Sequence, residues 1–275
     1  MSNRRLNVID IETGELVTDG SVYIRSKTQD DGYQKRLEKE RYIYSTRDRN
    51  WVASYHDPIE RISKELSLTE TGAIIKLLPY MRFKTQGKLI KDGKPLKQAD
   101  IQRIFKRGKT ATREILRILE EKGVIEVQKE GRANVFYISA EFHEIGNVDE
   151  SERFTKLYQV RTREITEKLA LHEAGILYKI LPFFHYERYY LCANPNESDK
   201  DNLRYINRKE LAQIVGLNED DVSRTVNKLR DLGALMSTKS GRSVRYLVHP
   251  DLMFRQATET EWTKAVREMF EAHRK

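Results

Sequence analysis

The sequence has a single cysteine, Cys192, so no disulfide can form within the chain and no cluster of thiols can hold zinc or an iron–sulfur centre. This cysteine usage is typical of the reducing cytoplasm. A long apolar run is also missing: residues 1–17 alternate charged and apolar side chains, which predicts neither a signal peptide nor a membrane anchor. We therefore expect a cytoplasmic protein without a membrane partner.

Complete catalytic motifs are missing too. The six histidines form no HExxH motif, and none has a second histidine two residues away, as metal-dependent nicking enzymes require. Residues 108–110 (GKT) match the end of a phosphate-binding loop, but Arg103 stands where its first glycine belongs. Tyr189 and Tyr190 have no neighbour in the sequence that would activate them as nucleophiles. We predict a non-enzymatic protein with no metal, cofactor or small-molecule ligand.

Charge, in contrast, is abundant. The 275 residues include 50 Lys and Arg against 42 Asp and Glu, a formal net charge of +8, and 39% hydrophobic residues, which fits two folded domains with a charged surface. Residues 84–132 include fourteen basic and seven acidic residues, so this part of the chain carries most of the excess positive charge. A local basic excess suits a polyanionic partner.

An internal repeat organises the chain. Leu66, Leu68, Glu70, Gly72, Lys76, Leu78 and Pro79 recur 103 residues later, from Leu169 to Pro182. After a polar segment of different length, the match resumes at an offset of 110, where Ile104, Leu119, Gly123, Lys129, Gly131 and Arg132 return from Ile214 to Arg242. We interpret this pattern as a duplicated domain.

Both copies have the same predicted order of elements. An apolar helix over 69–78 or 172–181 ends at a proline. A polar loop over 84–94 or 194–202 precedes a short helix over 98–105 or 208–215. A tight turn then leads to a longer helix that ends at Gly123 or Gly233. Two strand-like runs follow, over 124–127 and 135–138 or over 234–237 and 244–248, and predict a β-hairpin.

This order predicts a mainly α, α+β chain with small β-hairpins: two tandem winged-helix domains from an internal duplication. In that arrangement the longer helix enters the major groove and the hairpin lies along the DNA backbone. We expect an N-terminal arm or hairpin segment over 1–50, the first winged-helix domain over 51–148, the second over 149–256 and an amphipathic helix over 257–275. Thr258 and Glu261 have capping-box spacing in front of that helix, which could dimerise the protein or fold back on the second domain.

The segment LNEDDVSRTVNKLRDLGAL, over 217–235, resembles the recognition helix and wing entry of the MarR-like winged-helix regulators. VIDIETGELV over 8–17, FTKLY over 154–158 and the helix-turn-helix after an apolar helix resemble the RepL family of Firmicute plasmid replication proteins. Initiators of other plasmids are similar in having tandem winged-helix domains. These resemblances imply a DNA-binding protein of a plasmid or phage.

Double-stranded DNA is the predicted partner, with a homodimer as a second possibility, and the contacts are expected from the turn, the longer helix and the hairpin of each copy. The candidates are Lys106, Arg107, Lys109, Thr110, Thr112, Arg113, Arg117, Lys129 and Arg132 in the first copy, and Ser223, Arg224, Asn227, Lys228, Lys239, Arg242 and Arg245 in the second. A solvated helix face is the alternative for the first copy.

The two copies differ in charge. Three acidic residues, Glu219, Asp220 and Asp221, begin the longer helix of the second copy, where they would repel phosphate or cap the helix. The second copy could therefore bind DNA weakly or contact a protein. The aromatic stretch 183–190 could stack bases, but we favour the end of an amphipathic helix that packs between domains.

For the whole chain we predict sequence-specific duplex binding as a replication initiator of a mobile element. The alternatives are a transcriptional repressor of the same architecture and a protein–protein adaptor. The adaptor would be favoured if Arg113→Ala and Arg132→Ala left DNA affinity unchanged.

Overall fold

The computed structural model describes residues 13, 31–33, 50–131, 133–146, 148–149, 151–240 and 243–273 of the chain. By its contacts the chain divides into two units, Met1–Ser45 and Thr46–Lys275. The N-terminal arm predicted over 1–50 lies outside the described residues except at Thr13, residues 31–33 and Asn50. The fold described below is that of the second unit.

The second unit has an α+β fold with three small antiparallel hairpins and one four-stranded sheet. The first half of the unit contains β1 (Trp51–Tyr55), α2 (His56–Ser63), α3 (Leu68–Leu77), β2 (Ile90–Lys91), β3 (Lys94–Pro95), α4 (Gln98–Phe105), α5 (Lys109–Glu121), β4 (Ile125–Glu130), β5 (Ala133–Ile138) and β6 (His143–Glu144). The second half contains β7 (Phe154–Tyr158), α6 (Gln159–Thr166), α7 (Leu171–Lys179), α8 (Arg208–Val215), α9 (Glu219–Asp231), β8 (Leu235–Ser240), β9 (Ser243–Val248), β10 (Met253–Phe254) and α10 (Glu261–Ala272).

The four-stranded sheet joins the two halves in the order β10-β7-β1-β6. Strands β1 and β7 run antiparallel, and Ala53 pairs with Lys156 at their centre, 103 residues further along the chain. The outer strands repeat this relation, because β6 pairs Glu144 with Ala53 and β10 pairs Phe254 with Lys156. The pairing is therefore two-fold symmetric about the central pair, and equivalent residues are 103 positions apart in β1 and β7 and 110 positions apart in β6 and β10, the same two offsets as in the sequence repeat.

Helices α3 and α7 cross at two glycines. A Cβ added at Gly72 would lie 1.8 Å from the Leu171 carbonyl oxygen, and one added at Gly175 would lie 2.1 Å from the Leu68 oxygen. The two contacts are reciprocal, since Leu171 and Gly175 follow Leu68 and Gly72 by 103 residues each. Only glycine allows the two backbones to approach this closely.

Two equivalent lysine side chains lie beside the helix crossing, and each donates to a carbonyl of the other half of the unit. The Lys76 amine donates to the Leu169 carbonyl and the Lys179 amine to the Ser63 carbonyl, both at 2.7 Å. Helix α3 is buried almost all round, because α7 lies on one side of it and α4 and α5 on the other. The α3–α7 pair is thus a layer inside the unit.

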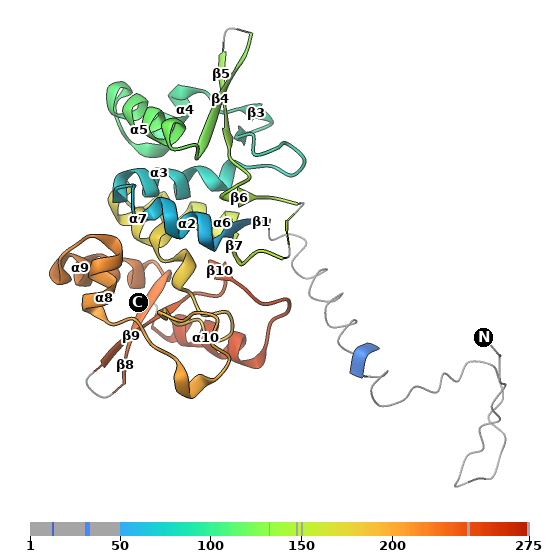
Figure 1. The fold of residues 1–275 in the computed structure, drawn as a ribbon, viewed down its shortest axis with the longest axis vertical. Coiled ribbons are helices and arrows are strands. Elements are labelled where there is room, and N and C mark those ends of the chain that lie inside the picture. The colour runs from blue at the N-terminus through green and yellow to red at the C-terminus, as the bar shows by residue number, and fades with distance from the viewer. Residues whose placement is uncertain are drawn as a thin grey trace. The chain divides into compact units, whose positions relative to one another are not determined.

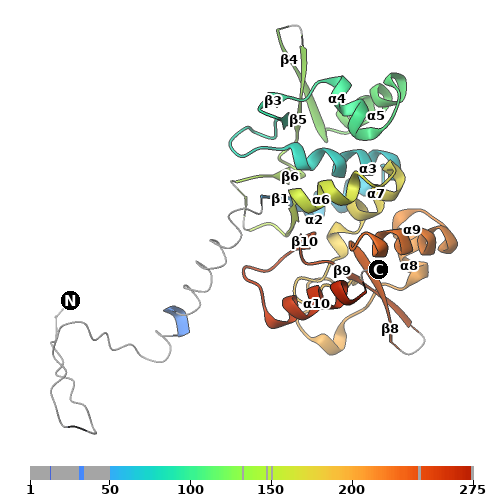
Figure 2. The same ribbon diagram turned by 180° about the vertical axis from the view of Figure 1, so that it is seen from behind.

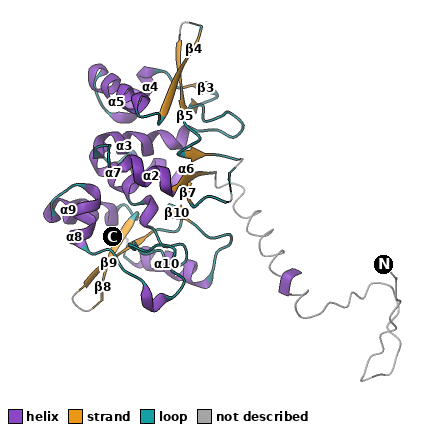
Figure 3. Ribbon diagram, viewed as in Figure 1, coloured by secondary structure: helices purple, strands orange, loops and turns teal. Residues whose placement is uncertain are grey.

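Figures 1 and 2 show this layer between two outer groups. We call α4, α5 and the hairpin β4–β5 the first head, and α8, α9 and the hairpin β8–β9 the second head. The hairpins extend away from the layer at opposite ends of the unit, as the secondary-structure colouring of Figure 3 also shows. Helices α5 and α9 flank the layer at the same edge in both views.

Several predicted elements are confirmed. Helices α4 and α8 have the predicted bounds, and the longer helices end before Gly123 and Gly233. The apolar helices end at Leu77 and Lys179 and continue as 3₁₀ turns, Leu78–Tyr80 and Leu181–Phe183, that contain the prolines. The hairpin strands run further toward their tips than predicted, because charged residues there also pair across the ladder.

The structure corrects two predictions. The loop predicted over 84–94 contains most of a small hairpin, β2–β3, because Asp92 and Gly93 both have positive φ, as a two-residue hairpin turn requires. The cap of the C-terminal helix is Thr260, whose side chain accepts from the Thr263 amide, and Glu261 is already the first helical residue. The capping box predicted at Thr258 and Glu261 is therefore wrong.

Of the two positions predicted for the C-terminal helix, the structure shows the folded-back one. Thr263, Val266 and Phe270 on α10 are buried, and the Phe270 ring lies 4.6 Å from the His249 ring. The Tyr189 hydroxyl lies 2.8 Å from the Thr263 hydroxyl. Within the aromatic stretch 183–190, Phe184, His185 and Tyr189 are buried, and the Tyr189 ring packs near the rings of Phe184 and Phe254 in the same half of the unit.

Candidate nucleic-acid interface

The first head presents one face of α5 to solvent. Ile115, Leu116 and Leu119 are buried against the rest of the unit, which leaves the faces between them for polar side chains. Among the candidates, Lys109, Thr110 and Arg113 are exposed on α5. The side chains of Lys109 and Arg113 form no hydrogen bond or ion pair with any residue that the structure describes, so both cations are available to a partner.

The start of α5 is also open. Its N-cap residue, Gly108, has no side chain to cap the first amides, and no acidic residue lies in the first turn. The first amides of a helix have no intrahelical acceptor and carry partial positive charge, which makes such an end suitable for a phosphate. Gly108 and Arg107 beside it are exposed. The free amides, Arg107 and Lys109 thus gather at one end of the helix.

Three other candidates in the first head have different roles in this structure. Arg117 pairs with Glu114 at 2.6 Å and with Glu121, and these hydrogen bonds raise the pKa of its guanidinium further above the ordinary value. The Lys106 amine donates to the Glu167 carbonyl at 2.8 Å. Thr112 is fully buried, with its hydroxyl 3.5 Å from the Arg107 carbonyl. The prediction that Thr112 contacts DNA is therefore wrong, because its side chain lies in the core.

In the hairpin of the first head, the structure describes one predicted DNA contact, Lys129. It lies opposite Asn134 in the β4–β5 pairing and is exposed. Arg132, at the tip, lies outside the described residues. Nearby, Lys88 pairs with Glu130 at 2.5 Å. Lys129 is therefore the cation of this hairpin that the structure leaves exposed at a position suited to the DNA backbone.

The second head has the same elements as the first, but different side chains lie at the start of its longer helix. The Asn218 side chain accepts from the Asp221 amide and caps α9, and Glu219, Asp220 and Asp221 occupy the first turn. Arg224 pairs with Asp221 at 2.8 Å. At the start of α9, one amide and the Arg224 guanidinium are therefore already engaged, and three acidic side chains lie where a phosphate would bind.

The remaining candidates of the second head are partly engaged as well. Lys228 pairs with Glu173 at 2.7 Å, and the Ser223 hydroxyl donates to the Glu219 carbonyl at 2.8 Å. Arg245 stacks on the Tyr205 ring, with its guanidinium carbon 3.8 Å from the ring centre. Asn227 and Lys239 are exposed, and Arg242 lies outside the described residues. The free cations of the two candidate surfaces are thus concentrated on the first head.

The sequence reasoning missed a basic pocket that lies between α3, α4 and α6. It brings together cations from distant parts of the chain, among them Lys76, Arg103 and Arg163. A signal was present in the sequence, because Lys76 was recognised as a repeated residue. Its partners could not be found by spacing, since they come from three separate elements.

Two side chains with catalytic potential, His143 and Cys192, lie in the core. His143 is fully buried, with its ring nitrogens 3.0 Å from the Ser54 and Tyr178 hydroxyls. Burial raises the pKa of the Cys192 thiol to about 12, which keeps it protonated. Among the described residues, no group of three or more His, Cys, Asp or Glu side chains could hold a metal ion. No helix in the described part of the chain is both long and apolar enough to cross a membrane.

Comparisons with models of known protein families, with curated proteins and with solved structures found no match to this chain. What the chain does is therefore argued from its own residues.

Proposed function

We propose that this chain is a sequence-specific double-stranded-DNA-binding protein with two tandem winged-helix domains that arose by internal duplication. The order of a short helix, a tight turn, a longer helix and a hairpin in each head supports the winged-helix assignment. The duplication is supported by spacing: α5 and α9 begin and end 110 residues apart, and β1 and β7 begin and end 103 residues apart.

One observation carries the proposal of DNA binding. The first head exposes an uncapped helix start together with Arg107, Lys109 and Arg113, and no acidic side chain lies in that first turn. In a winged-helix complex α5 would enter the major groove, where Arg113 would donate to base edges. Lys109 and the first amides of α5 would hold a phosphate, and Lys129 on the hairpin would contact the backbone.

The geometry also bears on the form of the target site. Because α5 and α9 lie at the same edge of a layer with two-fold symmetric pairing, the two heads would read half-sites in opposite orientations along one duplex. Their contact residues differ, so the half-sites should differ in sequence. The first head should supply most of the affinity, because the cations of the second head are largely paired.

We further propose a cytoplasmic role as the replication initiator of a plasmid or phage, with a transcriptional repressor of the same element as the alternative. Both roles rest on the same contacts. A third role, the protein–protein adaptor, is favoured for the second head alone by its acidic helix start.

Titration of a selected duplex at two salt concentrations tests this proposal. Arg113→Ala should weaken binding by about 1–3 kcal/mol and relax sequence preference at one position. Lys109→Ala should weaken all sequences alike and lower the salt slope by about 1. Lys264→Ala removes an exposed cation on α10, a helix that belongs to neither head, and is the control for net charge. If both α5 variants, Arg113→Ala and Lys109→Ala, bind DNA like the wild type, α5 is not the reading helix.

A further inference from the structure

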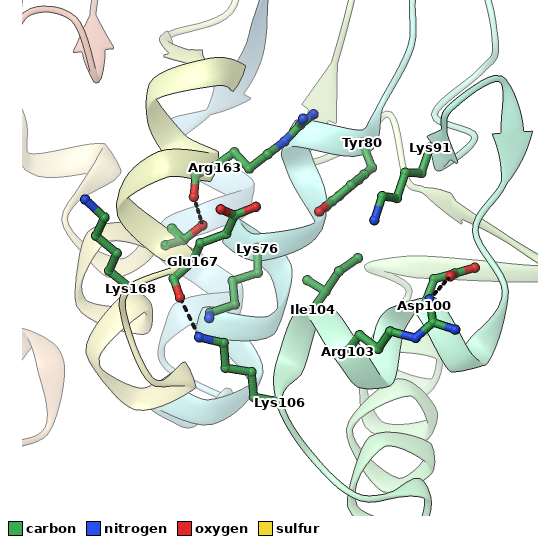
Figure 4. A pocket seen from close by; sticks show the side chains of 11 residues that line it. Lys76, Tyr80, Lys91, Asp100, Arg103, Ile104, Lys106, Arg163, Glu167 and Lys168 are labelled. Carbon is green, nitrogen blue, oxygen red and sulfur yellow. Dashed lines mark hydrogen bonds and ion pairs between the residues drawn. The ribbon is translucent and has the colours of Figure 1, made fainter.

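The basic pocket has a volume of about 460 Å³ and is open to solvent. It lies where the first head meets α3 and α6, and Figure 4 shows its lining side chains. Six cations line it: Lys76, Lys91, Arg103, Lys106, Arg163 and Lys168. Two carboxylates, Asp100 and Glu167, also line it, and Asp100 is engaged with Arg103 at 3.2 Å and with the Lys97 amide at 3.0 Å.

Burial and the repulsion between neighbouring positive charges make this cluster of cations energetically unfavourable. Lys76 is only 3% exposed, and burial, followed by the charge of Lys106, lowers the pKa of its amine to about 8. The Nε of Arg163 is buried and has no hydrogen-bond partner among the described residues, while its guanidinium lies 5.1 Å from the Tyr80 ring centre. In Figure 4, Lys91 points toward Tyr80 over the pocket, whereas Lys168 points away. An anion in the pocket would offset the repulsion among these groups.

A second pocket at the equivalent place in the other half shows that the fold does not need these charges. It has nearly the same volume, about 470 Å³, and is lined by residues at the repeat offsets of 103 and 110. Lys76 is matched there by Lys179, but three cations are replaced: Arg103 corresponds to Gln213, Lys106 to Gly216 and Arg163 to Glu60. The hollow belongs to the shared architecture. The second pocket has two lysines, Lys64 and Lys179, whereas Arg103, Lys106 and Arg163 are particular to the first half.

Lys106 gives a further reason to look for a function. Its φ of 52° lies in the left-handed region, where the second half has Gly216 at a φ of 73°. A residue with a Cβ costs about 1 kcal/mol or more in this conformation, so lysine is retained at a position that glycine would fill without strain. Its amine reaches the Glu167 carbonyl at the pocket. Strain of this kind often marks a functional position.

We propose that the basic pocket binds a small phosphate-bearing anion of the size of a nucleoside diphosphate. Arginine and lysine together are the usual protein groups for phosphate. The Arg103 side chain is 76% exposed and pairs with Asp100 through one nitrogen, so its other donors can turn toward a phosphate. Ile104 and Tyr80 supply an apolar wall for the rest of the molecule, and the volume falls in the range of small-ligand sites. The proposal does not depend on DNA binding, and it revises the sequence-based expectation of no small-molecule ligand.

The test is isothermal titration of the full chain, free of DNA, with ADP, inorganic phosphate and adenosine. The double variant Lys91→Gln, Arg103→Gln removes two exposed pocket cations. The matched control, Lys94→Gln, Lys97→Gln, makes the same change of charge in the adjoining β3 and at the start of α4, outside the pocket. Circular dichroism should show all three proteins equally folded, since every replaced side chain is on the surface.

We expect saturable binding of ADP by the wild type at submillimolar concentration, weaker binding of phosphate and none of adenosine. The pocket double variant should bind ADP at least about tenfold more weakly, while the control stays within about twofold. Lys106→Gly should fold and also bind more weakly. The proposal is overturned if ADP does not bind the wild type, if adenosine binds as well as ADP, or if the pocket double variant and the control double variant lose the same amount of ADP affinity. If free phosphates fail to bind and only the pocket double variant loses duplex affinity, the pocket holds a phosphate of the DNA backbone instead.

Discussion

Replacing Gly72 with alanine tests the crossing of α3 and α7, on which the placement of both heads depends. The added methyl group would lie 1.8 Å from the Leu171 carbonyl oxygen, where ordinary contact begins at about 3.4 Å. The helices would have to move apart by more than an ångström in a close-packed core, and overpacking of this kind costs about 1–3 kcal/mol or more. Backbone atoms cannot rotate away as a side chain can.

Helix propensity acts in the opposite direction, because alanine is favoured over glycine by up to about 1 kcal/mol in a helix interior. Because the 1.8 Å contact places the overpacking cost at the upper end of that range, we expect Gly72→Ala to lower the free energy of unfolding by about 2 kcal/mol, measured by urea titration with an unchanged slope. Gly175→Ala should behave alike, since its Cβ would meet the Leu68 oxygen at 2.1 Å. Gly108→Ala is the control, with no atom within 4 Å of the new Cβ, and should cost less than about 1 kcal/mol. Stability of Gly72→Ala equal to or above that of the wild type would refute the close crossing.

Three further predictions concern stability. Burial lowers the pKa of His143 to about 3 and that of His56 to about 2, so the unfolded chain takes up protons first as the pH falls below 6.5. The stability that these neutral rings contribute is complete above pH 6.5. Below that pH the free energy of unfolding should fall by up to about 1.4 kcal/mol per pH unit for each ring, down to about pH 3. Urea midpoints measured at pH 7, 6 and 5 would show this fall, and midpoints that do not change with pH would contradict it. Phe270→Ala should cost about 3 kcal/mol in the same assay, because the ring is 5% exposed, and a loss below 1 kcal/mol would mean that α10 does not dock. Lys106→Gly should leave stability within about 1 kcal/mol, whereas Lys106→Val should lower it by more, and equal stability of the two would exclude the left-handed backbone at this position.

Local patterns were enough to predict the heads. The apolar spacing between residues 98 and 105, followed by a turn and a glycine-ended helix, determines helices and hairpins that depend mainly on neighbours in the sequence. The repeat also identified Lys76 and Gly72 as equivalent to Lys179 and Gly175. The repeat could not show why these residues recur. The structure shows that the two glycines allow α3 and α7 to approach closely, and that each lysine donates to a carbonyl of the other half.

The four-stranded sheet was not predicted, because its central strands are five residues long and their pairing partners lie 99 to 107 positions apart. Periodicity within a short segment contains no information on such a partner. The availability of the predicted DNA contacts was hidden for a similar reason. Arg117 and Arg113 look alike in the sequence, but the ion pairs of Arg117 to Glu114 and Glu121 distinguish them only once the helix surface is built.

The measurement that tests the central claim most directly is selection of bound duplexes from a random pool by the full chain, followed by titration of the selected sequence at two salt concentrations. The account predicts one motif with two unlike half-sites in opposite orientations. Its affinity should fall steeply as salt is raised, because phosphate contacts release counterions. Failure to enrich any motif, with weak binding to every duplex, would contradict sequence-specific DNA binding and favour the adaptor.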